Sequence, residues 1–228
     1  MGFSTLVRIC NLRYFFALRI VAEVTALVEI DSGAQKTPAF RSGWPVFRSG
    51  NTPFSMIHRI QFEQWVPLGI DKVFLLFANP SNLPRIMPPE TRTELAALRL
   101  VPPPTVPMGQ PVIANLNSLA GVGSEIVTSF RPLASLPFRA QWIALITEFE
   151  WNHQFADVQK KGPFKRFQHR HEFSLGTRNG ASGTTVRDVV EYDPGFGVLG
   201  DLAKRLSITP SLKRTFEYRQ KMLEKLLC

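Results

Sequence analysis

Three consecutive segments in the C-terminal half of the sequence alternate so that polar side chains share an otherwise apolar face. From Arg166 to Leu175 the chain reads Arg-Phe-Gln-His-Arg-His-Glu-Phe-Ser-Leu. Side chains alternate across a β-strand, so the aromatic and histidine side chains lie on one face and Gln, Arg and Glu on the other. We expect the aromatic face to point inward. Its members are Phe167, His169, His171 and Phe173.

The two neighbouring segments repeat this pattern, and turn sequences separate them. A Gly162-Pro163 turn precedes the central segment, and the Gly176–Gly183 stretch follows it. In each flanking segment the expected inward face again mixes apolar and polar side chains. The inward residues are Phe155, Asp157 and Gln159 before the central segment, and Val186, Asp188, Val190 and Tyr192 after it.

The turn positions predict which polar side chains meet. If Gly162-Pro163 centres one hairpin, Asp157 lies near His169, with Gln159 beside them. If the Gly176–Gly183 loop closes the next hairpin, Asp188 lies opposite His171.

Buried polar groups cost free energy unless they are paired, so several interpretations of this inward face stay open. It could be a paired network that fixes strand register, or a patch that anchors the polar head of an apolar ligand. It could also be a catalytic site in which Asp188 orients His171 as a general base. A metal site built from the same histidines and aspartates is a minor fourth option. We expect no metal.

Composition sets the broad class of the protein. A chain of 228 residues with 44% hydrophobic residues can bury a sizeable core without disulfides. The only cysteines, Cys10 and Cys228, lie at opposite ends, which excludes a cysteine-based zinc site within the chain and fits a reducing compartment. We therefore expect a cytoplasmic protein.

The net charge of +9 and the pI near 10.0 invite a nucleic-acid interpretation. The basic residues are scattered, however, and no RNA-binding, helix-turn-helix or zinc-finger pattern accompanies them, so we expect no nucleic-acid partner. The densest cluster surrounds the Gly162-Pro163 turn and is typical of a solvated hairpin tip; binding of an acidic partner or membrane surface is the alternative. Its residues are Lys160, Lys161, Lys165, Arg166 and Arg170.

Residues 1–55 do not match the regular pattern that follows, and we expect an N-terminal extension followed by one domain over residues 56–228. Basic residues such as Arg8, Arg13 and Arg19 interrupt its apolar pieces, so we expect no stable membrane insertion. An acid-poor, basic start also resembles an organelle transit peptide. The alternative is an overlong start, with Met56 as the true first residue.

The order of elements over residues 56–228 predicts an α+β fold. Thr209 is expected to cap a long C-terminal helix with Pro210 in its first turn, and Asp71 to cap the first short helix. The expected strands are His58–Val66, Leu95–Val101, Ser124–Leu133, Phe138–Phe149 and the three described above; the expected short helices are Asp71–Phe77, one from Ser81, and Asp201–Leu206.

These pieces together resemble the SRPBCC superfamily of START-like, helix-grip proteins, and most closely bacterial proteins labelled cyclase/dehydrase or coenzyme-Q-binding-like. The resemblance covers about residues 57–227. Residues 1–55 have no counterpart in it, and Gln110–Gly123 looks like an insertion. The matching pieces are Val73–Leu83, Phe155–Gln159, Gly162–Phe164, His169–Phe173, Thr185–Tyr192 and Phe216–Arg219.

The resemblance implies a helix-grip fold, in which a curved antiparallel sheet wraps a long C-terminal helix, with two short helices after the first strand. It implies binding, carriage or sensing of a small hydrophobic molecule such as a lipid, quinone, polyketide or isoprenoid, with no cofactor; it leaves the oligomeric state open. The alternative is a cyclase/dehydrase-type enzyme that uses His171 and Asp188. The expected ligand-binding residues are Trp142, Phe155, Asp157, Gln159, Phe167, His169, His171, Asp188, Tyr192, Phe216 and Arg219.

Overall fold

The computed structural model describes residues 57–108, 115–131, 139–195 and 208–227. The expected extension over residues 1–55 and the expected helix Asp201–Leu206 lie outside the described residues. Both therefore stay predictions.

One antiparallel sheet forms the framework of the described chain. Its seven strands lie in the order β1-β7-β6-β5-β4-β3-β2. The last strand, β7, therefore pairs with the first strand, β1, which forms one edge of the sheet, and β6 lies near the middle. The strands are β1 (His58–Val66), β2 (Glu94–Arg99), β3 (Glu125–Phe130), β4 (Ala140–Glu150), β5 (Gln154–Lys161), β6 (Arg166–Arg178) and β7 (Ala181–Asp193).

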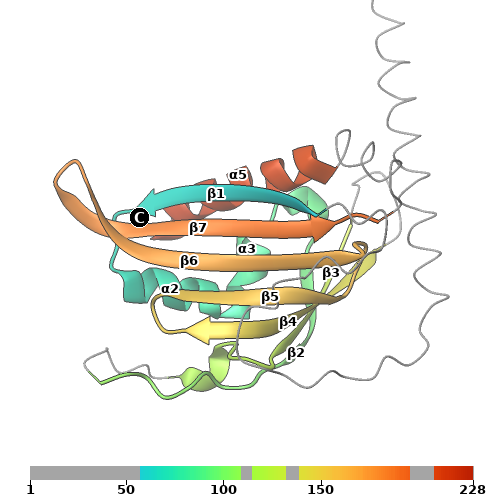
Figure 1. The fold of residues 1–228 in the computed structure, drawn as a ribbon, viewed down its shortest axis with the longest axis horizontal. Helices are drawn as coiled ribbons and strands as arrows, with labels where there is room; N and C mark the ends of the chain where they lie inside the picture. Colours follow the sequence, from blue (N-terminus) through green and yellow to red (C-terminus); the bar gives the residue numbers. More distant parts are fainter. Residues whose placement is uncertain (1–56, 109–114, 132–138, 196–207, 228) are drawn as a thin grey trace, which may run out of the picture.

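The helices lie along one side of this sheet (Figure 1). The two short helices α2 (Ile70–Ala78) and α3 (Leu83–Ile86) follow β1, and the long helix α5 (Thr209–Leu227) ends the described chain. Helix α2 contacts β6 and β7, whereas α5 contacts β1 and α3. The helix-grip architecture that the sequence predicts is therefore confirmed. No helix among the described residues combines the length and apolar character that a bilayer crossing needs.

Two aromatic-rich clusters fill the layer between the sheet and the helices. In the first, the ring of Phe74 on α2 packs edge-on against Phe155 and Phe173 from β5 and β6. In the second, Phe216 on α5 packs with Val190 and Tyr192 of β7. The residues predicted to face inward thus form the core, and the two clusters meet at the middle of β6.

The strand register agrees with the turn positions read from the sequence. Asp157 lies opposite His169, and Phe155 opposite His171, between β5 and β6. His171 lies opposite Asp188 between β6 and β7. The close spacing of antiparallel strands therefore brings these polar side chains to one place.

The expected cap of the first helix is wrong in one detail. Helix α2 begins after Gly69, whose carbonyl accepts from the backbone N–H groups of Lys72 and Val73. Asp71 lies inside the first turn and makes no capping hydrogen bond. A carboxylate in that position still interacts favourably with the positive end of the helix dipole.

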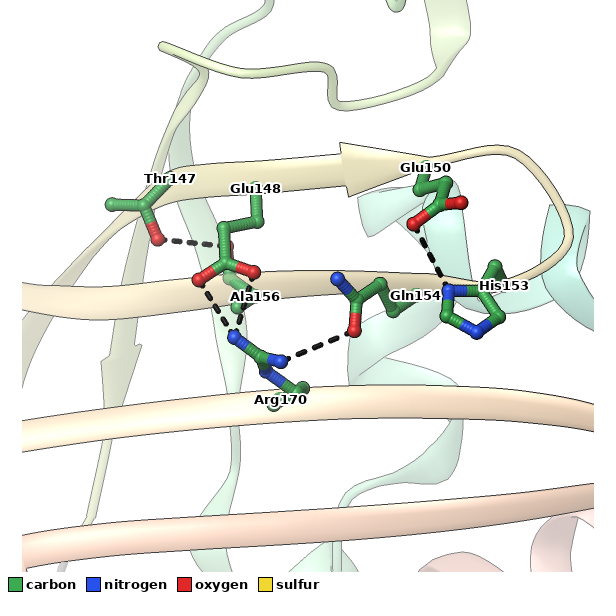
Figure 2. A network of polar contacts seen from close by, with 7 residues as sticks. All are labelled: Thr147, Glu148, Glu150, His153, Gln154, Ala156 and Arg170. Atoms are coloured by element: carbon green, nitrogen blue, oxygen red, sulfur yellow. Dashed lines mark hydrogen bonds and ion pairs between the residues drawn. The ribbon is translucent and has the colours of Figure 1, made fainter. Parts of the chain in front are cut away.

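Arg170 also departs from expectation, because it belongs to a buried network and not to the solvated hairpin tip. It lies in one cross-strand row with Ala156 and Glu148, on the sheet face opposite the two histidines. Its Nη2 donates to both carboxylate oxygens of Glu148, at 2.8 and 2.7 Å, and its Nη1 donates to Gln154 at 3.1 Å (Figure 2). The small Ala156 side chain between the two strands leaves room for this bidentate pair.

The described part of the Gln110–Gly123 segment packs against the body of the domain. It contains a short 3₁₀ turn at Leu116–Ser118, and Leu119 belongs to the first core cluster. The backbone N–H of Ala120 donates to the carbonyl of Ala78 at the end of α2. This segment therefore adds apolar cover beside α2.

The close approach of β1 to β7 explains why position 183 is a glycine. A Cβ atom at Gly183 would collide with the carbonyl oxygen of Val66 and with the indole ring of Trp65. We predict that Gly183→Ala lowers the free energy of unfolding by about 1–3 kcal/mol, because the strands must separate to admit the methyl group. Urea denaturation measures the change. Ser182→Ala, at the exposed neighbouring position, is the control and should change little; an equally stable Gly183→Ala protein would contradict the packing argument.

Candidate functional site

A single carboxylate, Asp188 on β7, is shared by two histidines on β6. Nε2 of His169 lies 3.0 Å from Oδ1 of Asp188 in hydrogen-bond geometry. Nδ1 of His171 lies 2.6 Å from the same oxygen, a close polar contact that lacks the alignment of a good hydrogen bond. All three side chains are buried. We call Asp157, His169, His171 and Asp188 the His–Asp cluster.

The predicted pair between His169 and Asp157 is present but is the weaker contact. Nδ1 of His169 lies 3.8 Å from Oδ2 of Asp157, across the β5–β6 ladder. Because Nε2 of the same ring turns toward Asp188, His169 bridges the two carboxylates. The cluster is therefore one connected network and not two separate pairs.

Burial and mutual contact set the charges in the cluster. Burial, reinforced by the neighbouring His169, lowers the pKa of His171 to about 3. For Asp188, burial acts to raise the pKa, but His171 and the hydrogen bonds from both histidines outweigh it and hold the pKa well below the ordinary range. Burial raises the pKa of Asp157, although His169 and Arg219 oppose the shift.

These pKa shifts determine which ring nitrogen of His171 carries the hydrogen. An ionised carboxylate can only accept, so the nitrogen that faces Asp188 carries the hydrogen. His171 is neutral near pH 7, because its pKa is about 3. Its other nitrogen, Nε2, is then left as an acceptor.

Aromatic rings surround the His–Asp cluster on three elements. Phe155 on β5 lies 4.5 Å, centroid to centroid, from His171. Phe77 on α2 lies 5.2 Å from the same ring, and Phe216 on α5 meets His169 edge-on at 5.4 Å. The polar cluster is thus enclosed by apolar side chains from the sheet and from both helices.

A buried arginine from α5 completes the surroundings. Arg219 is only 8% exposed. Its guanidinium carbon lies 5.1 Å from the ring centroid of Phe216 and 6.0 Å from that of Phe77. Its positive charge acts on Asp157, Asp188 and His171 through space. The side chain of this expected ligand-binding residue therefore lies inside the protein and does not extend to solvent.

Three other expected residues form a neighbouring aromatic group. Trp142 meets Phe167 at 4.7 Å and Phe164 at 5.9 Å. Tyr192 also contacts Phe164, and its hydroxyl lies 3.0 Å from Oγ1 of Thr209, at the start of α5. These residues pack the end of the core near the hairpin turn, beside the His–Asp cluster and not within it.

Gln159 lies away from the cluster that it was expected to join. Its side-chain amide donates to the carbonyl of Phe164 at 2.7 Å and accepts from the N–H of Phe164 at 3.2 Å. Both hydrogen bonds close the β5–β6 turn. The side chain therefore has a structural partner at the hairpin.

Sequence reasoning missed one residue of the site, Phe77. Its ring contacts both His171 and Arg219. Phe77 is the last residue of the expected helix Asp71–Phe77, but the helical periodicity of a sequence carries no information about which strand a given side of the helix meets. Only the packing of α2 across β6 shows that Phe77 belongs to the site.

Three members of the cluster have donor atoms close enough together for a metal ion. One donor atom each from Asp157, His169 and His171 lies within 4.8 Å of the others. The Arg219 guanidinium acts on the same groups, however, and a second buried cation beside it would be repelled.

The chemistry open to His171 is limited by its environment. A general base works best when its pKa lies near the operating pH. With a pKa of about 3, His171 is a weak base at neutral pH. The predicted contact with Asp188 is present, but the arrangement suits hydrogen bonding to a bound molecule better than proton abstraction.

No protein-family model matches the sequence. No curated protein matches it closely enough to count as a relative.

Solved structures show the same fold. Protein Ms6760 from Mycobacterium smegmatis is similar over 77% of this chain and 98% of its own, with 11% identity and a TM-score of 0.50. A START superfamily protein from Mycobacterium smegmatis has 15% identity and a TM-score of 0.49 over 75% of this chain and 97% of its own. Norcoclaurine synthase from Thalictrum flavum, in complex with dopamine and hydroxybenzaldehyde, has 14% identity and a TM-score of 0.48 over 84% and 98%. At 11% identity, the likeness to protein Ms6760 shows a shared fold and nothing further.

The depressed pKa of His171 predicts a pH-dependent stability. In the unfolded chain His171 takes up a proton near its ordinary pKa of 6.5. In the folded protein the same ring stays neutral until the pH falls to about 3. The unfolded state thus binds more protons in this window, and stability falls as pH drops below about 6.5. We expect this group to account for a loss of up to about 2 kcal/mol between pH 6.5 and 5.

Urea denaturation of the protein and of His171→Phe at both pH values measures this contribution. The variant keeps a ring among the aromatic neighbours and should lose most of the pH dependence. His153→Ala, at an exposed position, is the control and should keep it. An unchanged slope in His171→Phe would contradict the assignment.

Proposed function

We propose that this chain binds a small, largely apolar molecule between the sheet and α5, with the polar end of the molecule at the His–Asp cluster. The observation that carries the proposal is the placing of one polar cluster among aromatic rings from β5, α2 and α5. An apolar site with a few convergent polar groups is the usual composition of a small-molecule site. The helix-grip fold supports the proposal, and the resemblance suggests a lipid, quinone, polyketide or isoprenoid-like ligand.

The alternative of a purely structural network explains only part of the arrangement. It accounts for Asp188, because two histidines satisfy the buried carboxylate. It does not account for Arg219, whose guanidinium is buried and, among the described residues, contacts two aromatic rings but no carboxylate. A network selected only for stability would be expected to pair that charge with an acid, as Glu148 pairs with Arg170.

The enzymatic alternative, a cyclase/dehydrase-type reaction with His171 and Asp188, has weaker support. It needs a base that is active at neutral pH, whereas burial holds the pKa of His171 near 3. Binding without turnover asks only that His171 and its neighbours form hydrogen bonds. We therefore favour carriage or sensing over catalysis.

Native mass spectrometry of the full-length protein, followed by denaturing extraction, tests the proposal. We expect a stoichiometric apolar passenger, or saturable uptake of the neutral apolar probe N-phenyl-1-naphthylamine. Phe77→Ala should weaken probe binding several-fold, because it removes a ring that covers the cluster. Leu76→Ala, the adjacent half-buried residue of α2, is the matched control.

Two results would count against binding. A folded protein that is purified empty and takes up no probe would refute the proposal. Equal loss of affinity in the Phe77→Ala and Leu76→Ala proteins would place the bound probe somewhere other than at the cluster.

A further inference from the structure

Arg219 is unusual because it is a buried cation without a direct partner. It lies on the apolar stripe of α5, three residues after Phe216 and four before Leu223, and all three side chains are buried. Within the described part of the chain it makes cation–π contacts with Phe216 and Phe77 but no hydrogen bond or ion pair. A guanidinium carries five N–H donors in a fixed planar fork. The Nε donor of Arg219 is buried and has no hydrogen-bond partner among the described residues.

The two carboxyl groups that act on Arg219 through space each have an oxygen that faces a histidine. Oδ1 of Asp188 faces both histidines, at 3.0 and 2.6 Å. Asp157 faces His169 at 3.8 Å, and burial favours its neutral form. Arg219 therefore interacts with the cluster only through space, which leaves its hydrogen-bonding fork available.

A buried, unpaired charge is expensive, so a residue of this kind calls for a compensating anion. The cation–π contacts offset part of the cost, but an aromatic ring supplies no oxygen acceptor to the N–H groups. The group that matches two parallel N–H donors is a planar pair of oxygens, as in a carboxylate. A singly charged carboxylate also loses less hydration on burial among aromatic rings than a doubly charged phosphate does.

We propose that the molecule bound between the sheet and α5 is an apolar carboxylic acid, and that Arg219 binds its carboxylate. This inference rests on the proposed function and names its ligand class. The carboxylate lies against the Arg219 fork, and the hydrocarbon part lies among the surrounding rings. The His–Asp cluster stays intact beneath the head group, and Nε2 of His171 is free to accept a hydrogen bond from any further hydroxyl on the ligand.

A pair of ligands that differ only in the head group tests the inference on the unmodified full-length protein. We would compare dodecanoate with 1-dodecanol, below their aggregation limits and at 0.15 M salt, by calorimetry and by displacement of N-phenyl-1-naphthylamine. The expected preference for the acid is about ten-fold or more in Kd, since a charge-assisted hydrogen bond is lost with the alcohol.

Variants assign the preference to one side chain. Arg219→Met keeps the length of the side chain and removes the charge; it should abolish the preference for the acid while 1-dodecanol still binds. Arg219→Lys keeps the charge without the fork and should give an intermediate preference. Arg187→Met, an exposed arginine paired with Glu63, is the matched control and should keep the full preference.

The outcomes separate the inference from the proposed function. Equal binding of acid and alcohol, or a preference that survives in Arg219→Met, would overturn the inference and leave the apolar site standing. No binding of acid, alcohol or naphthylamine probe to a folded, empty protein would overturn both. The comparison on the unmodified protein decides the matter even if Arg219→Met fails to fold.

Discussion

The carboxylate of Asp188, buried under α5, constrains much of what surrounds it. An ionised group in that position needs donors, and the two histidines of β6 supply them only in one strand register. A slip of one residue would turn both rings to the opposite face of the sheet. Register, burial and charge are therefore linked: the hairpin places the histidines, the histidines satisfy the carboxylate, and α5 can then cover it.

The opposite face of the sheet carries another buried charge, Arg170. Arg170 and Arg219 differ in the partners that the protein gives them. Arg170 directs its two terminal nitrogens, Nη1 and Nη2, to Gln154 and Glu148 at 2.7–3.1 Å. Arg219 is about as deeply buried, yet among the described residues it contacts the rings of Phe216 and Phe77 and has no carboxylate partner. The first arrangement holds three strands together. The second has the form of a site that is completed by something from outside the chain.

The alternation of side chains and the turn positions were enough to predict the central facts of the site. They placed Asp157 opposite His169 and Asp188 opposite His171, because antiparallel strands joined by short turns have few possible registers. The same reasoning failed where contacts depend on side-chain reach. Gln159 shares a face with Asp157 but bonds to the turn backbone. Arg170 lies beside a basic turn in sequence but reaches across two strands to Glu148.

By itself the sequence determined the class of the fold, the order of its elements and the inward face of β5, β6 and β7, since these depend on local periodicity and turn chemistry. Only the tertiary structure decided that one carboxylate serves both histidines, that Phe77 joins the site and that Arg219 is buried without a carboxylate partner among the described residues. The reason is physical: periodicity states which way a side chain points, whereas a hydrogen bond depends on the distance to atoms that lie far away in the chain. Arg219 is the clearest case, because a charged residue on an apolar helix stripe could equally extend to solvent, and only the packing of α5 over the sheet encloses it.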